Sequence, residues 1–288
     1  MKMKNTLVAL LSALLLLTGC GNGNQTNQTP KLEKKLPIGL QMYGMRDDLA
    51  QDFYGTLVKV KEMGYEGVEF SGLHNIDPAQ IRQWCDELGL VVVSNHVSVT
   101  EMVADIEGSI EMCRKLGCKY ICAPWFFEDR RPGGENFARL MNELDTVSMA
   151  ATEAGFTYLY HNHDFEFDRV EDGRFGLDYI FETHSDSLMK AELDLCWIKY
   201  AGQDPIAYLE KYSDRTQLVH LKDYYVAEDG TFEFRPLGQG IQDVPALIQK
   251  TYETNATWLL VEQDNPTPGK SAMQCSQESM DYLREILK

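Results

Sequence analysis

Short apolar segments alternate along the chain with longer stretches in which apolar residues recur every three or four positions. The short segments are rich in Val, Ile, Leu and Tyr, which is typical of strands buried on both faces. The longer stretches have the spacing of amphipathic helices, as in Ile81, Trp84, Cys85 and Leu88. This alternation predicts parallel strands joined by crossover helices. Eight strands are expected, at residues 38–43, 67–70, 90–95, 120–124, 156–162, 189–194, 218–222 and 257–262.

Glycines stand between a helical stretch and the following strand at several of these junctions. Gly64, Gly89, Gly117 and Gly155 occupy such positions. A glycine there can adopt the left-handed conformation that ends a helix and turns the chain back. The pattern predicts an α/β fold of one domain over residues 37–288, a closed (β/α)₈ TIM barrel, for which about 250 residues are usual.

An open doubly wound sheet is the alternative arrangement of the same elements. Such a sheet normally carries a glycine-rich phosphate loop after its first strand. The segment after the first expected strand holds a single glycine, Gly44. The Gly238-Gln239-Gly240 motif comes too late in the chain and does not match a dinucleotide fingerprint. The pattern therefore favours the barrel and gives no support to a nucleotide cofactor.

The first nineteen residues have the pattern of a secretion signal. Lys2 and Lys4 precede an apolar run over residues 7–17 that is too short to span a bilayer comfortably. The run ends in Leu17-Thr18-Gly19-Cys20, which resembles the lipobox of bacterial lipoproteins. That resemblance implies removal of residues 1–19 as a lipoprotein signal peptide and lipidation of Cys20. A cleaved signal without a lipid on Cys20 is the alternative.

The segment after Cys20 contains almost nothing to bury. Residues 20–36 are rich in Asn, Gln, Thr, Gly and Lys, which predicts a flexible tether between a lipid and the domain. A run of acidic residues does not follow Cys20, so we expect a lipid-anchored protein of the bacterial cell envelope that faces the periplasm. The membrane is thus an expected partner through the anchor.

The charge balance restricts the other partners. With 27 Lys and Arg against 44 Asp and Glu, the formal net charge is −17 at pH 7, which would repel a phosphate backbone. Nucleic acid is therefore not an expected partner. Besides Cys20, six cysteines stand in apolar contexts without the paired spacing of a zinc site, which favours buried thiols.

Polar residues end most of the expected strands. In a barrel of this type the active site forms at the C-terminal ends of the strands. Carboxylates with imidazole suit one divalent metal ion such as Mn²⁺, Co²⁺, Mg²⁺ or Zn²⁺. A single His or Glu at a strand end is more often structural, so the prediction depends on several strands converging. The residues concerned are Glu69, His96, His161, His163, Glu166, Asp194, His220, Lys222 and Glu262.

Five motifs together resemble the xylose isomerase-like TIM barrel superfamily, in particular its sugar phosphate isomerase/epimerase branch. They are IGLQMY at 38–43, GYEGVEF at 64–70, YHNHDFEF at 160–167, HLKD at 220–223 and VEQD at 261–264. The resemblance implies one catalytic metal held by an acid from strand five, Asp from strand six, His from strand seven and Glu from strand eight. It assigns Asp194, His220 and Glu262 to the last three places.

Strand five departs from the family pattern. Many relatives have a Glu where this chain shows His161-Asn162-His163. We expect Glu166 to be the fourth metal ligand and a catalytic group, with His163 acting as base or acid beside the metal and His161 contacting substrate. The alternative makes His161 the ligand and Glu166 a substrate contact.

The remaining candidates have weaker signals. Lys222 could polarise a substrate carbonyl or steady an enediolate, but it could equally pair with Asp223 or Glu262. Glu69 and His96 are expected to hydrogen-bond sugar hydroxyls or to support the ligands. Trp125 offers a face for a sugar ring and Arg235 a cation at the rim, with ordinary packing and surface exposure as the alternatives.

These residues predict proton abstraction beside a carbonyl, with the resulting enediolate stabilised by the metal. The family resemblance favours a sugar isomerase or epimerase, and export together with the lack of a phosphate loop favours a non-phosphorylated sugar or glycoside. The alternative is a 3-keto-glycoside lyase that eliminates a β-substituent. Phosphodiester hydrolysis is opposed by the negative charge, and a non-catalytic sugar-binding lipoprotein is opposed by the convergent ligands.

Overall fold

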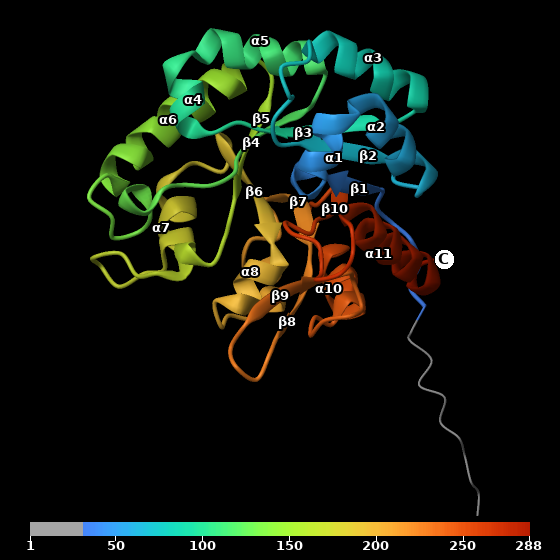
Figure 1. Ribbon diagram of the computed structural model, residues 1–288. Coiled ribbons are helices and arrows are strands. Elements are labelled where there is room, and N and C mark those ends of the chain that lie inside the picture. The colour runs from blue at the N-terminus through green and yellow to red at the C-terminus, as the bar shows by residue number, and fades with distance from the viewer. Residues whose placement is uncertain (1–30) are drawn as a thin grey trace, which may run out of the picture.

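The predicted barrel is confirmed. The computed structural model describes residues 31–288, in which eight parallel strands close in the order β1-β10-β7-β6-β5-β4-β3-β2 (Figure 1). The predicted signal peptide and Cys20 lie outside the described residues. The expected strands agree with the observed ones to within about two residues at each end. The barrel strands are β1 (Ile38–Gln41), β2 (Gly67–Phe70), β3 (Val91–His96), β4 (Tyr120–Ala123), β5 (Thr157–His161), β6 (Met189–Asp194), β7 (Thr216–Leu221) and β10 (Trp258–Val261).

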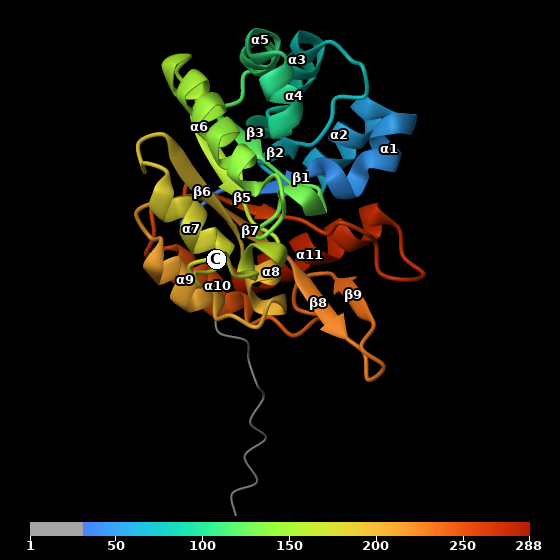
Figure 2. The ribbon, with the colours of Figure 1, turned by 90° about the vertical axis from the view of Figure 1, so that its left-hand side faces the viewer.

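Helices surround the barrel, as the two views of the ribbon show (Figures 1 and 2). Gly89 and Gly117 end two of them with φ values of 64° and 76°, so the sequence signal for left-handed helix ends is confirmed. The helices are α1 (Arg46–Gln51), α2 (Phe53–Glu62), α3 (Pro78–Leu88), α4 (Val99–Ala104), α5 (Ile106–Leu116), α6 (Phe137–Glu153), α7 (Gly176–Thr183), α8 (Leu195–Tyr200), α9 (Pro205–Lys211), α10 (Val244–Thr251) and α11 (Ala272–Ile286), with 3₁₀ turns η1 (Met42–Met45), η2 (Glu128–Arg130) and η3 (Phe165–Phe167). Among the described residues, none of these helices is both long and apolar enough to cross a bilayer.

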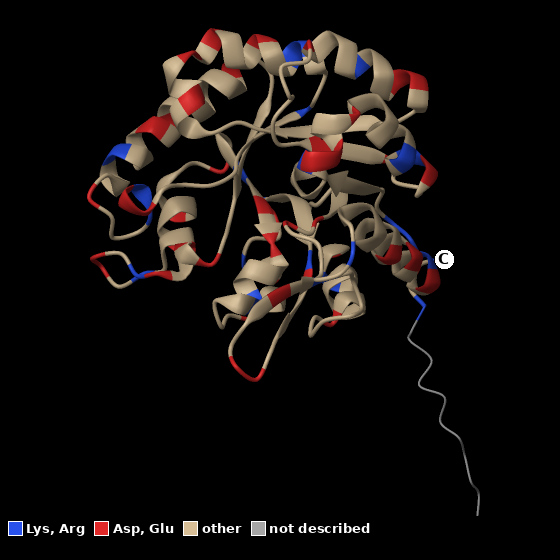
Figure 3. Ribbon diagram, in the orientation of Figure 1, with Lys and Arg blue, Asp and Glu red and all other residues tan. Residues whose placement is uncertain are grey.

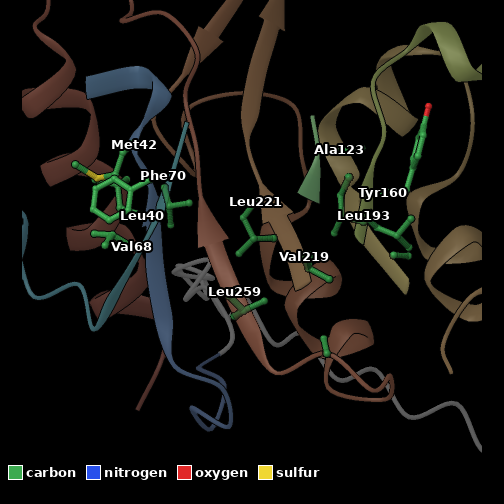
Figure 4. Packing of buried hydrophobic residues seen from close by; sticks show 14 of the residues in the cluster. Leu40, Met42, Val68, Phe70, Ala123, Tyr160, Leu193, Val219, Leu221 and Leu259 are labelled. Atoms are coloured by element: carbon green, nitrogen blue, oxygen red, sulfur yellow. The ribbon is translucent and has the colours of Figure 1, made fainter. Parts of the chain in front are cut away.

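Side chains alternate between the two faces of each strand. Those pointing outward, such as Leu193, Val219 and Leu221, belong to the large apolar cluster that includes the surrounding helices (Figure 4). Those pointing inward form a smaller apolar cluster that fills the barrel. The inner cluster comprises Val93, Tyr120, Cys122, Leu159, Leu218 and Leu260.

The inner apolar cluster gives way to polar side chains toward the C-terminal ends of the strands. On β5 and β7, Leu159 is followed two residues later by His161, and Leu218 by His220. Because residues i and i+2 of a strand share a face, these imidazoles lie directly above the apolar layer inside the barrel. The strand periodicity therefore places the polar cluster directly above a packed apolar layer.

An antiparallel hairpin of β8 (Asp223–Val226) and β9 (Phe232–Arg235) follows β7 outside the barrel (Figure 2). The segment after it contains the Gly238-Gln239-Gly240 motif. The Asp223 carboxylate accepts hydrogen bonds from the backbone N–H groups of Gly238 at 3.0 Å and Gly240 at 2.9 Å. A Cβ on Gly240 would lie 2.2 Å from an Asp223 oxygen, so glycine is required there by close approach. The motif thus has a structural purpose.

Candidate active site

Four side chains from four neighbouring strands meet at the barrel mouth. His161, Asp194, His220 and Glu262 each place one ligand atom so that all four atoms lie within 4.8 Å of one another. They come from the ends of β5, β6, β7 and β10, whose parallel pairing brings these ends together. All four are buried. Two imidazoles and two carboxylates with this spacing are a ligand set for a divalent metal ion.

The ring of His220 connects this group to a second layer of carboxylates below it. Its Nδ1 lies 2.8 Å from Glu262 Oε2, whereas its Nε2 lies 2.9 Å from Glu69 Oε1 and 3.0 Å from Glu192 Oε1. Burial by itself lowers the pKa of His220, but Glu192 and Glu69 raise that pKa well above its ordinary value. Carboxylates that hold one ring nitrogen fix the imidazole and aim the other nitrogen at a metal.

Glu192 is the centre of the second layer. One of its oxygens, Oε1, lies 2.9 Å from His96 Nε2 and 3.2 Å from His161 Nδ1. Burial raises the pKa of Glu192, but His220 and His96 outweigh it and hold the pKa well below its ordinary value. His96 is in turn affected: burial lowers its pKa, yet Glu69 and Glu192 raise it to about 10. The predicted candidates Glu69 and His96 therefore support the ligand group through Glu192 and His220.

Lys222 lies beside the ligand group, with its ammonium facing three carboxylates. Its Nζ is 3.0 Å from Asp194 Oδ2, 2.7 Å from Glu262 Oε2 and 2.8 Å from Asp264 Oδ1. Burial lowers the pKa of Lys222, but these three carboxylates raise it well above its usual range. The lysine therefore stays protonated, and it is paired with Glu262 rather than with Asp223, which binds backbone amides instead.

One buried oxygen atom, Asp194 Oδ2, shows whether these four side chains fit a metal ion. Within residues 31–288, Asp194 Oδ2 makes no hydrogen bond, although it lies within ion-pair distance of Lys222. The Lys222 ammonium balances its charge, and a carboxylate oxygen that accepts no hydrogen bond keeps its lone pairs available for a metal ion. The other Asp194 oxygen, Oδ1, accepts from the backbone N–H groups of Cys196 and Trp197, both at 2.9 Å, which orients the free oxygen into the site. His161, Asp194, His220 and Glu262 thus fit a divalent ion.

Glu166 does not join this group. It lies on η3, and its carboxylate accepts from the Tyr160 hydroxyl at 2.8 Å and from the His163 backbone N–H at 2.8 Å. Burial raises the pKa of Glu166 to about 8 against the effect of these two donors. Of the two expectations for strand five, the structure brings His161 to the ligand group and leaves Glu166 in a separate hydrogen-bonded position.

His163 faces the cavity above the ligand group. Its ring lies between Phe165 and Trp197, with centroid separations of 5.4 Å and 5.5 Å. Burial lowers the pKa of His163 well below its ordinary value, and His161 and Lys222 add to the effect. The imidazole is therefore neutral at neutral pH, and within the described chain its Nδ1 has no hydrogen-bond partner. A neutral imidazole with a free nitrogen can accept a proton.

A cavity of about 540 Å³ opens over these groups. Of the predicted substrate contacts, Trp125, His96 and His161 line it, whereas Glu69 lies beneath it and Arg235 pairs with Glu233 on β9 away from it. Sequence analysis did not single out several residues that belong to the site. Arg131 in the lining and Glu192 in the layer below were not named at all, whereas Gln41, Tyr43 and Asp264 stood in the quoted motifs without an assigned role.

A signal for Glu192 was present in the sequence. It stands two residues before Asp194 in the same strand, so both side chains point into the barrel. The approach of Arg131, by contrast, depends on how the loop after β4 folds, and strand periodicity carries no information about that loop.

Comparisons with known proteins identify the fold. A family model described as the xylose isomerase-like TIM barrel matches residues 57–286. A curated relative, the inosose dehydratase of Geobacillus kaustophilus (strain HTA426), is 26% identical over 202 residues, and the match covers 62% of this chain and 64% of the relative. The chain therefore spans less than two thirds of that relative's length.

Solved structures show the same fold. A sugar phosphate isomerase/epimerase from Parabacteroides distasonis ATCC 8503 superimposes with a TM-score of 0.74 at 21% identity, covering 89% of this chain and 96% of that one. The IOLI protein with a bound zinc atom superimposes with a TM-score of 0.67 at 15% identity, covering 87% and 98%.

Proposed function

Because the chain belongs to the xylose isomerase-like TIM barrel family, we propose that it is a divalent-metal-dependent enzyme that moves a proton beside the carbonyl of a non-phosphorylated sugar. The observation that carries the proposal is the buried group of His161, Asp194, His220 and Glu262 beneath the cavity. The names of two relatives, an inosose dehydratase and a sugar phosphate isomerase/epimerase, support a sugar or a sugar-like ring as substrate.

A divalent ion held by His161, Asp194, His220 and Glu262 would supply a Lewis acid for the substrate carbonyl. The chain supplies the remaining functions. His163, neutral and lining the cavity, accepts the proton from the carbon next to the carbonyl. The Lys222 ammonium lines the cavity and donates toward the negative charge that develops on the substrate oxygen. Trp125 and Trp197 provide apolar faces for the sugar ring.

The fate of the proton decides the reaction. Return to the opposite face of the same carbon gives an epimer, and return to the adjacent carbon exchanges aldose and ketose. We propose this isomerase or epimerase chemistry first. Elimination of a β-substituent from the same carbanion is the second candidate, favoured by a curated relative named as a dehydratase. Both outcomes use the same base and the same ligand group.

A non-phosphorylated substrate agrees with the charges of the cavity. Lys222 faces Asp194, Glu262 and Asp264, so it offers a hydrogen-bond donor to a developing enolate but little net charge to a phosphate dianion. The net charge of −17 opposes approach of such an anion.

The test is solvent deuterium incorporation. The mature domain, loaded with Mn²⁺ or Co²⁺, is incubated in D₂O with free sugars and 3-keto-glycosides and followed by NMR. We expect metal-dependent labelling that is lost in Asp194→Ala and reduced by at least about a hundredfold in His163→Gln. The labelled carbon and any released aglycone separate isomerase, epimerase and lyase.

The control variant is Arg139→Gln, on the outer surface of α6, where the side chain is 75% exposed. Metal binding without exchange or product across the panel contradicts the proposed chemistry, as does exchange that persists in Asp194→Ala.

A further inference from the structure

Arg131 reaches the cavity from the loop between β4 and α6. It follows η2, and its Nε donates to the Phe126 carbonyl oxygen at 2.9 Å. The guanidinium carbon lies 4.0 Å from the Phe165 ring centroid and 5.2 Å from that of Trp125. One hydrogen bond and two aromatic rings thus hold the guanidinium plane at the cavity wall, where the side chain is half-buried.

The two terminal nitrogens of Arg131 remain available. Within residues 31–288, no carboxylate oxygen lies within ion-pair distance of this guanidinium, and its recorded side-chain hydrogen bond uses Nε alone. Lys222, the other permanent cation of the lining, faces three carboxylates instead. The acidic lining residue Asp164 is not paired with Arg131 either. The chain has 44 acidic residues, yet none of those within residues 31–288 pairs with this guanidinium, which leaves its terminal N–H groups available to an anion.

We propose that Arg131 determines specificity by binding a carboxylate of the substrate, so that the substrate class is a carboxylated sugar, a uronate or a glycoside of one. The proposal rests on the proposed function only in placing the sugar in this cavity. Two parallel N–H groups of a guanidinium match the two oxygens of a planar carboxylate. A carboxylate carries one negative charge, which this one free cation can balance, whereas a phosphate dianion would leave excess charge in an acidic cavity.

The test compares acid and neutral forms of the same sugar. Calorimetry at low ionic strength measures binding of D-glucuronate against D-glucose, and of D-galacturonate against D-galactose, to the Mn²⁺-loaded protein. We expect each acid to bind about tenfold more tightly than its neutral partner, since hydrogen bonds to charged groups are the strong ones. In Arg131→Gln this preference is lost while the affinity for the neutral sugars is kept.

Two further variants make the test specific. Arg131→Lys keeps the positive charge but loses the two parallel N–H donors of the guanidinium, so part of the preference for acids should remain. Arg139→Gln removes an exposed guanidinium of α6 and should leave the preference intact. Circular dichroism verifies that each variant is folded.

Equal affinity for acid and neutral sugars, no binding of either acid, or a preference that survives in Arg131→Gln overturns the assignment. Failure of the proposed function gives a different result. A protein that prefers uronates through Arg131 but never exchanges deuterium contradicts the chemistry alone. Exchange on neutral sugars without any preference for acids contradicts the carboxylate site alone.

Discussion

His161 gives the ligand group a second imidazole beside His220. Asp194, Glu262 and Asp264 carry three formal negative charges around Lys222, so a divalent cation beside the ammonium would balance them. Replacing a third carboxylate by imidazole shifts preference away from Mg²⁺ and toward Mn²⁺, Co²⁺ and Zn²⁺. Glu192 Oε1 lies 3.2 Å from His161 Nδ1, an ion-pair distance at which no hydrogen bond is formed within residues 31–288.

Replacing His161 should therefore weaken metal binding, whereas replacing Glu166 should not. We expect His161→Ala and His161→Gln to lower the affinity for Mn²⁺ and Zn²⁺ by more than about tenfold, since even outer groups of metal sites contribute that much. Glu166→Gln should bind both ions as the wild type does, because its carboxylate is held by Tyr160 and the His163 amide. Calorimetric titration of the metal-free protein measures this, and the reverse order of effects would make Glu166 the ligand.

Glu166 should instead affect stability as a function of pH. Burial raises its pKa to about 8, against about 4.3 in an unfolded chain. For an acid whose folded pKa is raised, the contribution to stability is complete below the unfolded pKa and is lost as the pH rises through the folded pKa, at up to about 1.4 kcal/mol per pH unit. Urea unfolding of the metal-free protein between pH 5 and pH 8 should thus show a smaller decline for Glu166→Gln than for wild type.

The matched control for this measurement is Glu171→Gln, an exposed glutamate in the loop after β5. It should reproduce the wild-type decline. Identical slopes for Glu166→Gln and wild type would mean that Glu166 does not titrate in this range.

At the scale of the elements, the β8–β9 hairpin depends on a single carboxylate. Asp223 accepts four backbone N–H groups, from Tyr224, Gly238, Gly240 and Gln242, at 2.9 to 3.0 Å. These bonds fold the segment after β9 back onto the start of β8. The hairpin adjoins the cavity through Trp197, whose ring stacks on Phe232 at a centroid distance of 5.6 Å. Asp223 therefore connects the order of the hairpin to one wall of the site.

Asp223→Asn should loosen this segment. The amide keeps one accepting oxygen but turns an N–H₂ group toward backbone donors, which leaves buried donors unsatisfied and costs about 2 kcal/mol or more in the free energy of unfolding. Faster hydrogen exchange at the amides of Gly238, Gly240 and Gln242 would accompany the loss. Asp229→Asn, at the exposed hairpin turn, is the control and should change neither quantity. Unchanged hydrogen exchange at the three amides would show that the Asp223 carboxylate does not hold this segment.

Strands and helices could be predicted from hydrophobic periodicity. The positions of side chains on loops, turns and the hairpin could not. Buried β5 and β7 follow from their apolar runs, and the barrel from the repeated strand and helix lengths. The candidate ligands Asp194, His220 and Glu262 end such strands, and the family resemblance implied their role. Glu166 and Arg235 lie on a 3₁₀ turn and a hairpin whose geometry comes from tertiary hydrogen bonds. Sequence spacing alone could not show that these two side chains point away from the ligand group.

At the scale of the whole molecule, the cavity and the N-terminal entry of the chain lie at opposite ends of the barrel. The cavity lies at the C-terminal ends of the strands, whereas the chain enters β1 from the opposite end. There Leu32 N–H donates to the Ile286 carbonyl at 2.7 Å, and Lys34 N–H to that of Lys288 at 3.0 Å. An anchor attached before residue 31 would therefore join the barrel at the end opposite the cavity.

The acidic surface does not favour electrostatic attachment of the domain to a bilayer. Aspartate and glutamate are distributed over the surrounding helices (Figure 3), and the net charge is −17, so an anionic bilayer would repel the domain. We propose that Cys20 is lipidated and that the protein is held in the bacterial cell envelope, facing the periplasm.

On expression of the full chain in bacteria, wild type should partition into the detergent phase of Triton X-114 and incorporate labelled palmitate. Cys20→Ala should do neither, and Cys275→Ala, at a buried thiol, should behave as wild type. Labelling that survives in Cys20→Ala would rule out this anchor, whereas a wild type found wholly in the aqueous phase would favour a cleaved signal without lipid.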